Sequence, residues 1–107
     1  MFFVSGPPEP PNNVQAFPIC DRIDVTWEAS RKDGGSAVTG YMIRLQRGGD
    51  TVQSESLSAS ERTTSLGSLE KGTEYAVRIS SINTLGEGEW RVVFVNTTVT
   101  CKESYAR

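Results

Sequence analysis

Residues 22–28 read RIDVTWE, and apolar and polar residues alternate along the whole stretch. Ile23, Val25 and Trp27 fall on one side, and the polar residues between them fall on the other. A period of two is the repeat of a β-strand that has one buried face and one wet face. The stretch therefore predicts a strand that places Trp27 in a hydrophobic core.

The same alternation recurs further along the chain. Two stretches each direct three apolar residues to one face: Tyr41, Ile43 and Leu45 in residues 41–47, and Tyr75, Val77 and Ile79 in residues 75–83. Weaker strands are predicted at residues 14–19, 51–57, 62–66 and 92–99. No stretch has a sustained helical period. Seven short strands separated by turns predict an all-β protein, a seven-stranded antiparallel β-sandwich.

The last of these strands leaves its own orientation open. Residues 92–95 read VVFV, a continuous apolar run in which alternation cannot fix the register. Either Val92 and Phe94 face the core, or Val93 and Val95 do.

Turn signals separate the predicted strands, at residues 33–36 (DGGS), 47–50 (RGGD), 70–73 (EKGT) and 86–88 (GEG). Gly34, Gly35, Gly86 and Gly88 are expected to take positive φ where the chain reverses. The RGGD turn resembles the integrin-binding Arg-Gly-Asp tripeptide. Its extra glycine changes the separation and direction of the two charges, so integrin binding through this turn is not expected.

Composition excludes several classes of function. The chain has 107 residues, with 11 Lys plus Arg against 13 Asp plus Glu, so it lacks the concentrated positive charge of a nucleic-acid binder. No apolar run is long enough to cross a bilayer, and direct membrane insertion is not expected. Histidine, the commonest general base, is absent, and the serines therefore lack a partner for activation. We predict no enzyme activity, no metal and no cofactor.

Several short motifs in order resemble the fibronectin type III family. The lead-in at residues 7–11 (PPEPP), Val25-Thr26-Trp27, the DGGS turn and the Gly40-Tyr41 pair come first; Leu69, Gly72-Thr73, Tyr75, Asn83, Gly86 and Gly88 follow. The resemblance covers roughly Pro7 to Thr98. It departs from the family at Lys71, where proline is usual, and at Arg91 and Val93, where serine and proline are frequent.

The resemblance implies an immunoglobulin-like sandwich with a core that includes Trp27, Tyr41, Leu69 and Tyr75. It also implies a tyrosine corner, in which the Tyr75 hydroxyl bonds a backbone group upstream. For the organisation of the chain we expect a linker or expression-derived segment at residues 1–6, the domain at 7–101 and a C-terminal tail at 102–107.

The function implied is that of a non-catalytic module for spacing and protein–protein interaction, one of a tandem array in a larger cell-surface, adhesion or matrix protein. We expect it to be extracellular and, in isolation, monomeric. Two alternatives stay open: an intracellular filament or scaffold module of the giant muscle protein type, and an accessory spacer domain of a secreted bacterial enzyme. Oxidised cysteines would favour an extracellular location over a cytosolic one.

Partner contacts are expected on two loops that the family places at one pole, residues 30–38 and 84–90. In the second loop the candidate contacts are Leu85, Glu87 and Trp90, because tryptophan is enriched in binding hot spots. The alternative for Trp90 is that it covers an edge of the sandwich.

Cys20 and Cys101 are the two cysteines of the chain. In the fold that the resemblance implies, the turn after the first strand and the end of the last strand lie at the same pole. We therefore predict a Cys20–Cys101 disulfide, although the family does not require one; the alternative is two unrelated thiols.

Asn96-Thr97-Thr98 is a glycosylation sequon. If Phe94 faces the core, Asn96 does too and no glycan fits. Asn96 is thus a candidate glycosylation site that depends on the unresolved register.

Overall fold

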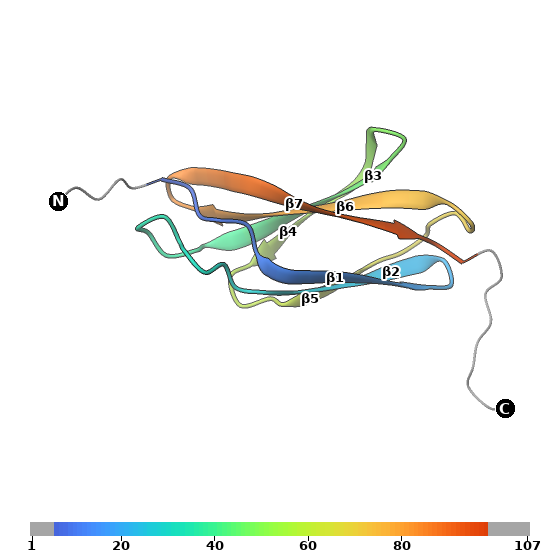
Figure 1. The fold of residues 1–107 in the computed structure, drawn as a ribbon, viewed down its shortest axis with the longest axis horizontal. Coiled ribbons are helices and arrows are strands. Elements are labelled where there is room, and N and C mark those ends of the chain that lie inside the picture. The colour runs from blue at the N-terminus through green and yellow to red at the C-terminus, as the bar shows by residue number, and fades with distance from the viewer. Residues whose placement is uncertain (1–5, 99–107) are drawn as a thin grey trace, which may run out of the picture.

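A computed structural model describes residues 6–98, which form two antiparallel sheets (Figure 1). The strands are β1 (Asn12–Ile19), β2 (Arg22–Glu28), β3 (Gly40–Arg47), β4 (Asp50–Ser58), β5 (Thr63–Leu66), β6 (Glu74–Asn83) and β7 (Gly86–Asn96). One sheet has the order β1-β2-β5, and the other has the order β4-β3-β6-β7. The predicted all-β sandwich is confirmed.

The core lies between the two sheets and is built from side chains that point inward at alternate positions along the strands. On β2, Ile23 and Val25 are fully buried and Trp27 is 3% exposed. The Trp27 and Tyr41 rings meet edge to face across the core, with centroids 5.6 Å apart. Burying one such large apolar side chain contributes roughly 1.5–3 kcal/mol, so these strands supply much of the stability. The four core residues that the resemblance implied are all buried: Trp27, Tyr41, Leu69 and Tyr75.

β7 begins six residues before the predicted start, and its observed register shows which of residues 92–95 face the core. Thr84 and Leu85 alone form the turn after β6, and Gly86, with φ 132°, starts the new strand. A two-residue turn is the commonest link between antiparallel strands, and it places residues 86–91 in the sheet. Val95 faces the core and is 9% exposed, whereas Phe94 on the other face is 69% exposed. Of the two alternatives, the one with Val93 and Val95 inward is correct.

The proline-rich lead-in is part of the packed structure. Pro8 and Pro11 are buried, and β1 already begins at Asn12, two residues before the predicted start. Val14 and Ala16 pack against the core from β1. The chain enters the sandwich at one end and β7 finishes at the other, so residues 6 and 98 lie at opposite poles (Figure 1).

Candidate interaction surfaces

The N-terminal pole is organised by the side chain of Asn83, the last residue of β6, which is only 3% exposed. Its amide nitrogen donates to the carbonyl oxygens of Gly6 at 2.8 Å and Asp33 at 2.7 Å, and more weakly to that of Ser36 at 3.4 Å. Its oxygen accepts a hydrogen bond from the Leu85 amide at 2.8 Å. A single buried amide thus joins the lead-in, the β2–β3 loop and the β6–β7 turn.

Backbone hydrogen bonds hold residues 6–11, here called the N-terminal segment, along the β2–β3 loop. The Gly6 amide donates to the Gly34 carbonyl at 2.9 Å, and the Glu9 amide donates to the Lys32 carbonyl at 3.0 Å. The Ser30 hydroxyl donates to the Glu9 carbonyl at 2.6 Å. Gly6, which the expected linker over residues 1–6 includes, is hydrogen-bonded to the domain.

Two glycines allow this close approach because neither has a Cβ, and one of them also has a positive φ. A Cβ on Gly34, which has φ 79°, would overlap the Gly6 carbonyl oxygen. A Cβ on Gly88 would overlap the Pro8 carbonyl oxygen. The expectation of positive φ holds for Gly34, Gly35 and Gly86, but Gly88 is not among the positive-φ glycines. At Gly88 the sequence needs glycine because the N-terminal segment crosses β7 there.

The three candidate contacts near the β6–β7 hairpin do not form one surface. Leu85 lies in the turn and is 51% exposed. Glu87, expected at a hairpin tip, lies within β7 and pairs with Ile82. Glu87 and Glu89 lie beside Pro7 and Pro8 of the N-terminal segment, on the side of β7 opposite to Trp90.

Trp90 lies on the outer face of the four-stranded sheet, here called the outer face, where it pairs with Ser80 and is half-buried. The guanidinium of Arg44 lies 4.8 Å from the centroid of its ring, and that of Arg78 lies 5.9 Å from it. Arg44 and Arg78 are direct cross-strand neighbours. Two like charges opposite one another are unfavourable in a sheet, and stacking both on one indole offsets part of that cost.

From Trp90 toward the C-terminal end of β7, the outer face is apolar. Val92 is 39% exposed and Phe94 is 69% exposed, and both share the face of Trp90. A shallow groove of about 260 Å³ runs beside them and is bordered by Ala76, Arg78 and Glu74. Asn96, the next residue on this face, is exposed. Phe94 and Asn96 therefore both face away from the core, which is the orientation that a glycan on Asn96 requires.

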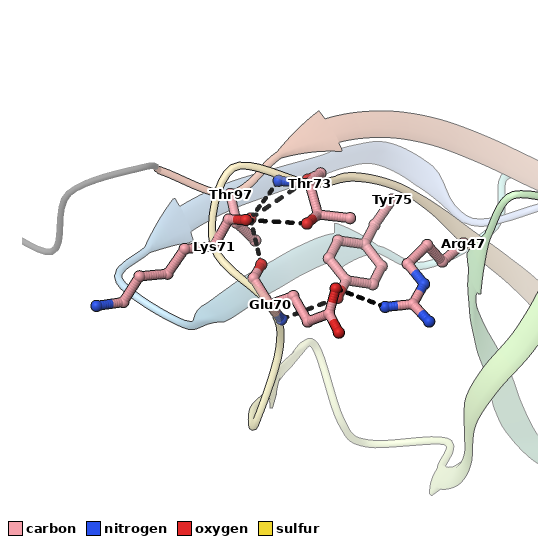
Figure 2. Close-up of polar contacts among 6 residues, drawn as sticks. All are labelled: Arg47, Glu70, Lys71, Thr73, Tyr75 and Thr97. Atoms are coloured by element: carbon pink, nitrogen blue, oxygen red, sulfur yellow. Dashed lines mark hydrogen bonds and ion pairs between the residues drawn. The ribbon is translucent and has the colours of Figure 1, made fainter.

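The opposite pole contains the tyrosine corner (Figure 2). The Tyr75 hydroxyl accepts a hydrogen bond of 3.0 Å from the Glu70 amide, as the resemblance implied. Thr97, 3% exposed, donates through its hydroxyl to the Glu70 carbonyl at 2.6 Å and accepts from the Thr73 amide at 3.0 Å. The Leu69 amide donates to the Asp21 carbonyl at 2.9 Å, which brings the β1–β2 turn to the same pole.

The RGGD turn lies at this pole too, and its arginine is engaged. Arg47 contacts the Glu70 carboxylate at 2.8 Å (Figure 2). The hydrogen bond with Glu70 raises the pKa of Arg47 above its ordinary value.

Cys20 lies in the β1–β2 turn, with φ 56°. Within residues 6–98 there is no free cysteine thiol. Cys101 lies outside the described residues, so the predicted pairing of Cys20 with Cys101 stays a prediction.

Residues 6–98 contain no cluster of three or more His, Cys, Asp or Glu side chains that could hold a metal ion. They also include no helix long and apolar enough to span a membrane.

The two-sheet fold and the tyrosine corner define an immunoglobulin-like β-sandwich domain. A family model described as "Fibronectin type III domain" matches residues 9–97. The chain therefore belongs to the fibronectin type III family.

Three proteins to which this chain is similar have much longer chains. Titin of Drosophila melanogaster is 31% identical over 85 residues, which cover 77% of this chain and, to the nearest whole number, 0% of titin. The FN1–FN3 domains of chicken CNTN1 share 27% identity at a TM-score of 0.76, covering 88% of this chain and 33% of that one. The twitchin kinase region of C. elegans shares 25% identity at a TM-score of 0.77, covering 91% and 18% respectively. The chain thus spans a small part of these relatives.

Sequence reasoning missed the role of Asn83 and of the N-terminal segment. Asn83 was identified only as part of the family pattern, and its hydrogen-bond partners lie as far away as Gly6. A signal was nevertheless present, because Gly34 and Gly88 are glycines that mark places where another segment can approach the backbone closely.

Proposed function

We propose that the chain is a non-catalytic spacer and protein-contact module of a larger cell-surface, adhesion or matrix protein. The observation that supports it best is the attachment of the N-terminal segment. Residues 6–11 are held to the domain at one pole, and β7 ends at the other. A preceding domain joined through such a segment would be linked at a fixed point beside the β2–β3 loop and the β6–β7 turn.

The relatives agree with a place in a tandem array. The chicken CNTN1 structure holds domains FN1–FN3, and this chain covers 33% of it, about what one domain of three would cover. A domain that takes up the chain at one pole and releases it at the other can be repeated end to end without a change in its fold.

For protein contact we propose the outer face around Trp90. Tryptophan and arginine are the residues most enriched in binding hot spots, and Trp90 here stacks with Arg44 and Arg78. The stacking preorganises all three side chains, which lowers the entropy lost when a partner binds. Leu85 and Glu87 remain candidate contacts on separate surfaces.

The extracellular location also rests on the proposed Cys20–Cys101 disulfide. Structural disulfides persist in oxidising compartments, and residues 6–98 contain no free thiol. Labelling of intact cells of the source organism with an antibody to this domain tests the location. We expect labelling without permeabilisation and, by mass spectrometry of the isolated protein without reductant, a disulfide between the two cysteines.

A filament module of the titin type is the second candidate, and the 31% identity to Drosophila titin favours it. Labelling only after permeabilisation, together with two alkylated cysteines in the isolated protein, would contradict the extracellular proposal and support this one. The spacing role would hold for either location.

A further inference from the structure

The second half of β7 is an apolar strand at the edge of a sheet. In the order β4-β3-β6-β7 it has a hydrogen-bonded neighbour on one side only. Residues 92–95 carry no charge, and Val92 and Phe94 expose 39% and 69% of their surface. Uncharged apolar edge strands pair readily with other chains, and native proteins protect such edges.

The first half of β7 has protection of its own. The Pro8 carbonyl lies against Gly88, and Arg91 donates through Nε to the Pro11 carbonyl at 3.3 Å. Glu87 and Glu89 add charge there. The N-terminal segment therefore covers the start of the strand, and the exposed apolar side chains lie beyond it.

A sequon follows directly, and its geometry suits modification. Asn96 is exposed and shares the face of Phe94, because residues two apart in a strand point the same way. Thr98 is exposed as well, whereas Thr97 between them is held by its hydrogen bonds to Glu70 and Thr73. Asn96 is thus exposed, next to a fixed residue, on the face of β7 that it shares with Phe94.

We propose that Asn96 carries an N-linked glycan whose first N-acetylglucosamine lies over Phe94. In the transfer, the Asn96 amide nitrogen bonds to the sugar C1 of a lipid-linked pyrophosphate oligosaccharide. The C1–O bond breaks, one amide proton is lost and the lipid pyrophosphate leaves. Alternate strand residues lie about 7 Å apart, so the first sugar on Asn96 can reach back and place the C–H face of its ring on the Phe94 ring.

The surroundings of Phe94 fit this occupant. The groove beside it is lined by apolar Ala76 and Val92 and by Gln46 and Glu74, whose polar groups can bond sugar hydroxyls. A glycan in this place would cover the exposed ring and hinder pairing at the edge of β7. The inference rests on the extracellular part of the proposed function, because N-linked glycans are added in the secretory pathway.

The test uses the chain secreted from eukaryotic cells and analysed by peptide mass spectrometry. We expect a glycan on Asn96 in the wild type and none in Thr98→Ala, which keeps both Asn96 and Phe94. The glycosylated wild type should melt roughly 2–4 °C above Thr98→Ala. Trimming the glycan to one sugar should keep most of this rise in Tm. Phe94→Ser should abolish that rise, whereas Leu85→Ser, an exposed apolar residue away from the site, should leave it unchanged.

Two results would overturn the inference, each in a different part. A secreted chain with its disulfide formed but Asn96 unmodified would refute the glycan while leaving the extracellular module intact. A glycan on Asn96 whose stabilisation is the same in Phe94→Ser would refute the role of Phe94. Circular dichroism of each variant establishes that the sandwich is folded before the Tm values are compared.

Discussion

Each pole of the sandwich has one central side chain, and the two side chains differ in how far along the chain their hydrogen bonds reach. At the tyrosine corner, Tyr75 bonds Glu70 only five residues upstream, within one turn-and-strand motif. At the N-terminal pole, Asn83 bonds Gly6 and Asp33, which are 77 and 50 residues away along the chain. A local motif can be identified from spacing, whereas an arrangement of distant segments depends on the completed fold. The difference separates the pole that contains the family's tyrosine corner from the pole that holds the N-terminal segment.

The largest effect is expected at the tyrosine-corner pole, from the Cys20–Cys101 disulfide. Closing a loop of this length stabilises by about 4.5 kcal/mol on the chain-entropy model, and Cys101→Ser should lower the free energy of unfolding by most of that amount. Urea denaturation of the oxidised protein with and without reductant measures it. Equal midpoints in the two conditions would show that the cysteines are not paired.

Asn83→Ala should have the next largest effect. Its amide satisfies two carbonyls at short distance and accepts from the Leu85 amide, so its loss should cost about 2–3 kcal/mol. Urea denaturation gives the value, with Gln15→Ala as the control because Gln15 is exposed and its amide nitrogen makes a weak contact of 3.4 Å to Asn13. A loss at Asn83 no larger than that at Gln15 would mean that the N-terminal pole is not held by this residue.

Gly88→Ala tests the same pole by steric means. The added methyl group overlaps the Pro8 carbonyl, so the N-terminal segment must shift, at a cost of about 1–3 kcal/mol. Gly67→Ala is the matched control, because its Cβ would meet nothing within 4 Å. If thermal melts place both variants together, the close packing of Pro8 on β7 is not important for stability.

Tyr75→Phe gives the smallest effect of the series and tests the opposite pole. The ring still fills the core, and only the bond from the Glu70 amide is lost, at about 1 kcal/mol. An unchanged denaturation midpoint would contradict the tyrosine-corner assignment. Asn83→Ala is expected to cost more stability than Tyr75→Phe. Asn83 makes several hydrogen bonds, whereas those at the tyrosine corner are divided between Tyr75 and Thr97.

The sequence was sufficient to predict the sandwich because period-two alternation and Trp27, Tyr41 and Tyr75 all concern residues close in the chain. The start of β7 was missed because Gly86 and Gly88 were assigned to a loop, although a two-residue turn left them in the sheet. Its register was undecidable since four apolar residues in a row fit either face. The packing of the N-terminal segment was not predicted, because its prolines cannot form a sheet ladder and its hydrogen-bond partners lie far away along the chain.

The central claim is that residues 6–11 are a fixed part of the domain, and amide hydrogen exchange at Gly6 and Glu9 tests it most directly. Both amides donate to backbone carbonyls of the β2–β3 loop, Gly6 to Gly34 and Glu9 to Lys32. We predict that both exchange at least roughly tenfold more slowly than in an unstructured chain, and that Asn83→Ala removes most of this protection at Gly6. Exchange of both amides at the unstructured rate in the wild type would contradict the account.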